Sequence, residues 1–159
     1  MINSFIGLLL LVVLCMAAAQ ARAQNQTPAN VGPVVGGWTD PATGLTWTTH
    51  DNGSDVNWNQ ANAYCSNLRL GGYSDWRIPT SDELQGIYDP SVDVPGQNPD
   101  GEMVTMHVKG NMKLSGDGHW SSILNDAGRA WWFAFDNGRL YTAPIYTSGK
   151  GWRALCVRR

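Results

Sequence analysis

The chain has 159 residues and a formal net charge of −2 at pH 7, and only 15% of its residues are charged. This composition argues against a coiled coil, a basic nucleic-acid-binding protein and a disordered acidic tail. Its 18 glycines and eight tryptophans indicate instead a loop-rich domain with many aromatic side chains.

Residues 1–23 have the features of a secretory signal peptide. An apolar and small-residue run, residues 5–19, is shorter than the roughly 20 residues that a membrane-spanning helix needs. Ala21-Arg22-Ala23 then provides an A-x-A cleavage site before Gln24. We therefore expect cleavage after Ala23 and a mature chain without a membrane span that is secreted, periplasmic or at the cell surface. A retained membrane anchor is the alternative interpretation.

The cysteines are consistent with export. Cys15 would leave with the signal peptide, so the mature chain retains Cys65 and Cys156. In an oxidising compartment such a pair most simply forms one disulfide, and two buried free thiols are the alternative. Because structural zinc takes four ligands, two cysteines without a matching histidine cluster make a poor zinc site.

The region after the signal peptide predicts a linker and a first pair of strands. Residues 24–37 are mostly polar and uncharged and contain Pro and Gly, which predicts a linker ahead of one domain over residues 38–159. Strands are expected over residues 34–38 and 45–49. The segment between them, Asp40-Pro41-Ala42-Thr43-Gly44, has the Pro and Gly of a tight turn.

Two amphipathic segments predict the helices of the domain. Over residues 57–68, apolar side chains recur at spacings of three and four, and Asn57 with Gln60 can form a capping box. A second, shorter helix is expected to begin at Thr80, because Glu83 follows three residues later, and to end at the next Asp-Pro pair.

The segment 89–118 shows no periodicity and contains five glycines, so we expect one long irregular loop. Loops of this length inside a compact domain are often functional. A mobile insertion that binds nothing is the alternative.

The last forty residues predict an antiparallel β-sheet. Its strands are expected over residues 119–124, 129–135, 139–145 and 152–157, with a hairpin turn at Asp136-Asn137-Gly138. Successive strand residues point to opposite faces, so Trp131 and Trp132 cannot both be core residues.

Several short segments resemble, in the same order, the C-terminal domain of bacterial collagen-like adhesins, the Lcl C-terminal domain family. They are Asp40-Pro41-Ala42-Thr43-Gly44-Leu45-Thr46-Trp47, the helix face from Trp58 to Cys65, Gly72-Tyr73-Ser74-Asp75-Trp76-Arg77-Ile78-Pro79-Thr80, Glu83-Leu84, Trp120-Ser121-Ser122 and Cys156-Val157-Arg158. The early W-x-x-A-x-x-x-C helix is also similar to that of the C-type lectin-like fold. The resemblance implies an α+β, C-type-lectin-like domain with two short helices, a long irregular loop and a C-terminal antiparallel β-sheet.

For function, the resemblance implies an exported binding module, a class that includes adhesins for glycosaminoglycan-like polysaccharides. Because fold alone does not fix function, this step is an analogy. We predict a non-enzymatic binding and adhesion domain that recognises a glycan, such as a sulfated polysaccharide, or a surface protein, and not nucleic acid. The alternatives are a structural or assembly subunit of an envelope or appendage complex and a degenerate enzyme of the formylglycine-generating type.

Aromatic rings and cations of the second half of the chain are the candidate ligand-binding residues. They are Trp131, Trp132, Trp152, Arg129, Arg139, Lys109 and Lys113. The rings can stack on the apolar faces of sugars, and the cations can converge on sulfate groups, with scattered solubilising charge as the alternative. The tryptophans on regular elements are expected in the core: Trp47, Trp58, Trp76 and Trp120.

The long loop also holds candidate calcium ligands, because Ca²⁺ takes six to eight oxygens, mostly from carboxylates and carbonyls. They are Asp93, Asn98, Asp100, Glu102 and Asp117. Asn98-Pro99-Asp100 is similar to the Glu-Pro-Asn type tripeptide of sugar-binding C-type lectins. Their later Trp-Asn-Asp, however, corresponds to Trp120-Ser121-Ser122, which lacks a carboxylate. We therefore expect no cofactor, with calcium as the alternative.

Catalytic motifs are not found in the sequence. It has no nucleophile elbow, zinc-binding histidine pair or phosphate-binding loop, and His50, His107 and His119 are isolated from one another. Formylglycine-generating enzymes share the C-type lectin-like fold and an Arg-x-Pro-Thr-x-x-Glu helix start like that of residues 77–83. Their chemistry uses copper-binding thiols, whereas both mature cysteines are expected here in a disulfide. The sequence therefore predicts a protein that is not an enzyme.

Overall fold

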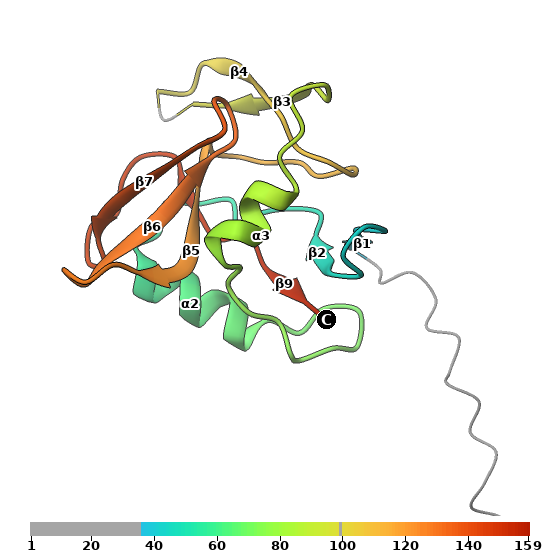
Figure 1. The fold of residues 1–159 in the computed structure, drawn as a ribbon, viewed down its shortest axis with the longest axis horizontal. Coiled ribbons are helices and arrows are strands. Elements are labelled where there is room, and N and C mark those ends of the chain that lie inside the picture. Colours follow the sequence, from blue (N-terminus) through green and yellow to red (C-terminus); the bar gives the residue numbers. More distant parts are fainter. Residues whose placement is uncertain (1–35, 99) are drawn as a thin grey trace, which may run out of the picture. The chain divides into compact units, whose positions relative to one another are not determined.

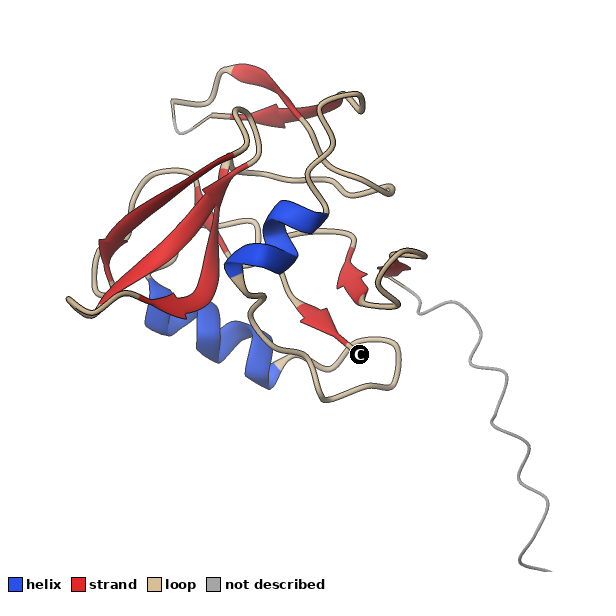
Figure 2. Ribbon diagram, viewed as in Figure 1, coloured by secondary structure: helices blue, strands red, loops and turns tan. Residues whose placement is uncertain are grey.

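The computed structural model describes residues 36–98 and 100–159, which form an α+β domain, as predicted (Figures 1 and 2). Its helices are α2 (Trp58–Asn67) and α3 (Ser81–Gly86). Its strands are β1 (Gly37–Thr39), β2 (Thr46–Thr48), β3 (Val94–Gln97), β4 (Met103–Met106), β5 (Gly118–Leu124), β6 (Arg129–Ala134), β7 (Arg139–Pro144), β8 (Trp152–Arg153) and β9 (Val157–Arg158). The predicted signal peptide and most of the predicted linker lie outside the described residues. The closer likeness to C-type lectins stays a prediction.

The described strands form three sheets, with the orders β1-β2-β9, β3-β4 and β7-β6-β5-β8. In the four-stranded sheet β8 pairs with β5 in parallel, so the predicted antiparallel sheet has one parallel edge. The strand expected over residues 152–157 is also two strands, β8 and β9, which belong to different sheets. Between them, Ala154, Leu155 and Cys156 are fully buried, because the chain crosses the core there instead of continuing along one sheet.

Both helices begin where the sequence predicts. In the α2 capping box, the Asn57 side chain accepts from Gln60 N at 3.0 Å, and the Gln60 side chain accepts from Asn57 N at 2.9 Å. Thr80 and Glu83 make the same reciprocal bonds at α3. Such boxes satisfy amide groups that have no partner inside the helix. The local sequence therefore fixes the start of each helix.

The segment expected as an irregular loop contains a hairpin, which corrects that prediction. β3 and β4 pair antiparallel from Val94↔Met106 to Gln97↔Met103. Gly96 is needed there, because a Cβ at this position would lie 2.5 Å from Met106 Cε. Pro and Gly inside β3 hide the alternation by which a strand is recognised. Figure 1 shows this hairpin at the opposite end of the domain from α2.

The core consists of two clusters. The first core cluster is mainly aliphatic: Leu45, Trp47, Leu84, Ile87, Met106, Val108, Met112, Leu114, Phe133, Phe135, Leu155 and Val157. The second core cluster is built from small residues and tryptophans: Ala61, Cys65, Trp76, Ile78, Trp120, Ala130, Ala143, Ala154 and Cys156. Of the four tryptophans expected in the core, three are buried, and the half-buried Trp58 packs against the second cluster.

The predicted disulfide joins Cys65 of α2 to Cys156, with an S–S distance of 2.01 Å and a Cα–Cα distance of 5.4 Å. Both cysteines are fully buried in the second core cluster. The disulfide therefore fixes α2 to the segment that leads into β9.

Candidate functional site

Four aromatic side chains form a continuous row across the four-stranded sheet, which we call the aromatic row: Tyr141, Trp132, Trp152 and Trp120. Trp132 of β6 lies directly opposite Tyr141 of β7, and their rings stack at 4.7 Å with an angle of 25°. The Trp132 and Trp152 centroids are 5.2 Å apart. Trp152 then meets Trp120 edge to face at 5.0 Å. Each ring thus contacts the next, from Tyr141 on the edge strand β7 through Trp132 on β6 and Trp152 on β8 to Trp120 on β5.

Two glycines make room for these rings. A Cβ on Gly118 of β5 would lie 2.7 Å from Trp152 Cδ1 and 2.9 Å from Trp132 Cε3. A Cβ on Gly149 would lie 2.4 Å from the Trp152 ring. Trp152 is therefore packed against two positions without a side chain, and any larger residue at either position would displace it.

The row is buried at one end and open at the other. Trp120 is fully buried, and its Nε1 donates to Val56 O at 2.8 Å. Trp132 and Trp152 are half-buried, and Tyr141 is 37% exposed on β7, the outer strand of the sheet. The buried end anchors the row, and the Tyr141 end presents aromatic surface to solvent.

Polar groups lie beside the open end. Arg139 lies two residues before Tyr141 on β7, so both side chains are on the same face of the sheet. Arg139 is exposed. Asn137 Nδ2 donates to the Tyr141 hydroxyl at 3.3 Å. The open end therefore combines aromatic surface with a cation and an amide. Tyr141 and Asn137 were not predicted, although the register of the hairpin turn could have placed Tyr141 opposite Trp132.

The structure separates Trp131 and Arg129 from this row. Both lie on the other face of β6, as the alternation of strand residues predicts. Trp131 is half-buried opposite Thr142. Arg129 binds the same neighbour, because its Nη2 donates to Thr142 O at 2.8 Å. Of the three candidate tryptophans, the structure brings Trp132 and Trp152 together.

The two candidate lysines contact other parts of the domain. Lys109 Nζ donates to Gly86 O, at the end of α3, at 2.8 Å. Lys113 lies beside His50 in an isolated bridge, and its backbone N donates to Thr49 O at 2.7 Å. Of the four candidate cations, Arg139 is the one on the face of the aromatic row. The expected convergence of these charges is not seen in their described contacts.

The family model described as the Lcl C-terminal domain matches residues 36–158, and so covers both described helices and all the described strands. The chain belongs to this family. The match confirms the resemblance stated from the sequence. A search for relatives among curated proteins finds no match.

The candidate calcium ligands of this Lcl C-terminal domain lie in or beside the β3–β4 hairpin, and most are engaged. Asn98 Oδ1 accepts from the backbone N of Asp100 and of Glu102, and Asn98 Nδ2 donates to Glu102 Oε2 at 3.0 Å. Asp100 lies 3.6 Å from Lys150 Nζ, and Asp93 lies 3.2 Å from His107 Nδ1. In residues 36–98 and 100–159, no group of three or more His, Cys, Asp or Glu is placed to hold a metal ion.

The remaining loop candidate, Asp117, lies between β4 and β5 and is half-buried. Burial raises the pKa of its carboxyl, and the nearby negative charge of Asp136 raises it further. Its backbone O accepts from Phe135 N at 2.9 Å, which ties it to the end of β6. The position of Asp117 is therefore fixed by a hydrogen bond to the end of β6 and not by the β3–β4 hairpin.

A buried polar cluster lies elsewhere in the Lcl C-terminal domain and contains residue types that serve as catalytic triads in other proteins. Asp51 Oδ2 lies 3.3 Å from His119 Nε2, and Asp51 Oδ1 accepts from Ser115 Oγ at 2.6 Å. The serine hydroxyl thus donates to the carboxylate. In a catalytic triad it would instead be hydrogen-bonded to the imidazole. His119 is also fully buried, so no substrate reaches its ring. This cluster was not predicted, because Asp51 is more than 60 residues away from Ser115 and His119 in the sequence.

Hydrogen bonding decides the charge state of Asp51. Burial alone would raise the pKa of this carboxyl, but the hydrogen bond and charge of His119 and the bonds from Ser115 outweigh it and lower the pKa from 3.8 to about 2. Asp51 is therefore ionised at neutral pH, and its contacts hold the loop after β2 against β5.

Within the described part of the chain, every helix is too short or too polar to span a bilayer.

Proposed function

We propose that this Lcl C-terminal domain is an exported, non-enzymatic binding and adhesion domain that recognises a glycan through the open end of the aromatic row. The observation that carries the proposal is the stack of Tyr141 on Trp132, which continues to Trp152 and has Arg139 on the same face. Aromatic rings fixed by their neighbours offer a flat apolar surface that loses little conformational freedom on binding.

The chemistry of this surface favours an anionic polysaccharide. The C–H faces of sugar rings stack on aromatic side chains, and a guanidinium binds sulfate or carboxylate groups through charge-assisted hydrogen bonds. The chain as a whole carries a net charge of −2, so attraction of an anionic glycan must come from local groups such as Arg139. In this proposal binding needs no cofactor.

Two features support binding without catalysis. The cysteines that a formylglycine-generating type of enzyme would need as thiols are joined in the disulfide between Cys65 and Cys156. The Asp51, Ser115 and His119 side chains bond one another beneath the surface.

The test is retention on immobilised heparin and on a glycan array at physiological salt, with and without calcium. Tyr141→Ala removes the exposed ring and is expected to weaken binding roughly tenfold, about 1.4 kcal/mol. Arg139→Gln is expected to weaken binding to sulfated ligands by a similar factor and to flatten its salt dependence. No retention of the wild-type domain in either calcium condition would refute the glycan proposal.

Arg129→Gln is the matched control, because Arg129 lies on the opposite face of the same hairpin. Its loss removes a bond to Thr142 but no group of the aromatic row. We expect this variant to bind like the wild type. Equal weakening by Arg129→Gln and Arg139→Gln would mean that retention depends on overall charge and not on the aromatic row.

A protein partner, as in an assembly subunit, is the second candidate function. Met103 on β4 is 67% exposed, and Tyr146 between β7 and β8 is 77% exposed. Side chains of this kind are enriched at protein interfaces. A stoichiometric partner that co-purifies with the wild type and is lost with Met103→Ser would favour assembly over glycan binding.

A further inference from the structure

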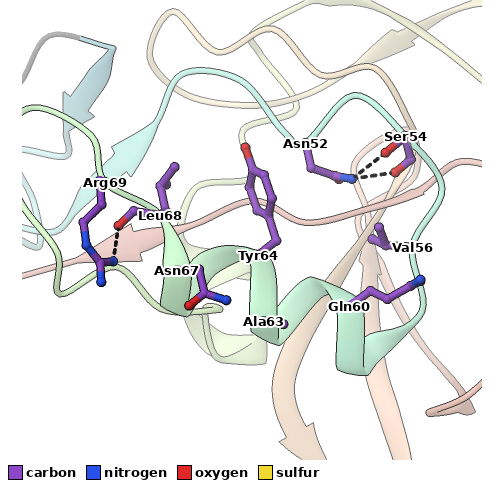
Figure 3. A pocket seen from close by; sticks show the side chains of 9 residues that line it. All are labelled: Asn52, Ser54, Val56, Gln60, Ala63, Tyr64, Asn67, Leu68 and Arg69. Atoms are coloured by element: carbon purple, nitrogen blue, oxygen red, sulfur yellow. Dashed lines mark hydrogen bonds between the residues drawn. The ribbon is translucent and has the colours of Figure 1, made fainter.

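An open groove on α2, away from the aromatic row, has room for a small ligand. It has a volume of about 610 Å³ and lies between one side of α2 and the loop that precedes it (Figure 3). Ligand pockets commonly enclose about 300–1,000 Å³. On the helix, Gln60, Tyr64 and Asn67 line it at spacings of four and three, so they share one face. Ser54 and Val56 line it from the loop.

The loop wall of the groove is held in place by hydrogen bonds to the C-terminal part of the chain. Asn52 donates its backbone N to Ala154 O, and its Oδ1 accepts from Ala154 N at 2.7 Å. Val56 N donates to Trp152 O at 3.0 Å. Asn52 Nδ2 also donates to Ser54 O at 2.7 Å, a bond drawn in Figure 3. The wall is therefore formed before any ligand arrives, which lowers the entropy lost on binding.

The floor of the groove offers an aromatic ring and hydrogen-bonding groups. Tyr64 is 39% exposed and rises from α2 toward the loop (Figure 3). Burial raises the pKa of its hydroxyl, and the negative charge of Asp51 raises it further, so the hydroxyl stays protonated and can donate. Asn67 and Ser54 are both exposed and add an amide and a hydroxyl group. This combination suits a ligand with several hydroxyl groups.

The charge of the groove restricts its ligand further. None of its nine lining side chains is acidic, and Arg69 is the one that is charged. Arg69 Nη1 donates to Leu68 O at 2.9 Å and to Ser66 O at 3.3 Å, which fixes the guanidinium at the end of α2. A guanidinium has five N–H donors, so donors remain for a carboxylate.

We infer that the α2 groove is a second binding site, and that it takes a small sugar acid, a monosaccharide unit with one carboxylate. Arg69 binds the carboxylate, the Tyr64 ring packs against the apolar face of the sugar, and Asn67 and the Tyr64 hydroxyl bind its hydroxyl groups. The site uses none of the residues of the aromatic row. It therefore stands or fails independently of the proposed function.

The experiment is a titration of the full mature chain with sodium D-glucuronate, followed by amide NMR shifts, with D-glucose and sodium acetate as comparison probes. We expect saturable shifts at Tyr64, Asn67 and Arg69, and weaker binding of both comparison probes. Shifts confined to β6 and β7, or no saturable shift, would overturn the inference. Equal affinity for acetate would also overturn it, because the sugar hydroxyl groups would then contribute nothing.

Two conservative variants test the named contacts. Arg69→Gln is expected to lower the affinity for glucuronate at least tenfold, and Tyr64→Phe, which keeps the ring, about threefold or more. The matched controls are Arg159→Gln at the exposed end of the chain and Tyr146→Phe on an exposed loop. Unchanged affinity in Arg69→Gln, or equal losses in the controls, would contradict the assignment. If Tyr141→Ala loses heparin retention but keeps the glucuronate-induced shifts, the two sites bind independently of each other.

Discussion

The two core clusters meet at β6 and are built in different ways. Phe133 of β6 belongs to the first core cluster, which is mainly aliphatic, and it is buried there beside the rings of Phe135 and Tyr88. Ala130, two residues from Trp132 on the same strand, belongs to the second, where tryptophan rings pack over small residues. Interlocking aliphatic side chains close a core, whereas large flat rings over alanine and glycine leave ring edges uncovered. The second cluster can therefore be both a core and the base of a binding surface.

Removal of the disulfide is expected to have the largest effect and to break the second cluster first. A crosslink over 91 residues contributes about 4–5 kcal/mol to the free energy of unfolding on the chain-entropy model. The Cys65→Ala, Cys156→Ala double variant should lose about this much in urea denaturation. Hydrogen exchange should accelerate in α2 before it does at Phe133 and Leu84. Equal acceleration in both clusters would show that they unfold as one unit.

Protonation of the buried Asp51 is expected to destabilise the edge of the first cluster. Its partner His119 packs edge to face on Phe135, a member of that cluster, at 5.3 Å. The pKa of Asp51 is lowered from 3.8 to about 2, so the unfolded chain binds a proton there that the folded chain does not. Asp51 therefore contributes stability above pH 4, about 2 kcal/mol, which is lost as the pH falls from 3.8 toward 2.

The measurement is the free energy of unfolding against pH for the wild type and for Asp51→Asn. The difference between the two curves should shrink as the pH falls through this range, whatever the stability of the variant at neutral pH. A constant difference between pH 2 and pH 5 would contradict the assigned pKa.

Gly118→Ala is expected to have an effect of similar or smaller size, and it tests the role of ring packing in the second cluster. The added methyl group would overlap the Trp132 and Trp152 rings, and overpacking of this kind destabilises by about 1–3 kcal/mol. Near-ultraviolet circular dichroism of the tryptophans should change, and heparin retention should weaken. Gly86→Ala is the control, because nothing lies within 4 Å of a Cβ there. Wild-type circular dichroism in Gly118→Ala would contradict the tight packing.

The parts of the fold that the sequence predicts are those set by neighbouring residues. The capping boxes at Asn57 and Thr80 need only a residue three positions away, and both were predicted correctly. The β3–β4 hairpin was missed because Pro95 and Gly96 are unfavourable in strands and Gly96 is selected by its contact with Met106.

The parts of the candidate site that depend on neighbouring residues were likewise predictable from the sequence. Strand alternation separates Trp131 from Trp132, and that follows from local geometry. The contact between Trp132 and Trp152 depends on the parallel pairing of β8 with β5, which brings together segments that a long connection separates. The pairing of Asp51 with His119 spans 68 residues and has no local pattern. Long-range pairing therefore accounts for most of what the sequence did not predict.

The sheet of β1, β2 and β9 has a mechanical consequence. β2 lies between the first and last described strands, so the chain enters and leaves through the two outer strands of one small sheet (Figure 1). The aromatic row belongs to a different sheet, β7-β6-β5-β8. A force applied to the two ends of the domain would thus act first on the β1-β2-β9 sheet and not on β7, the strand that carries Tyr141.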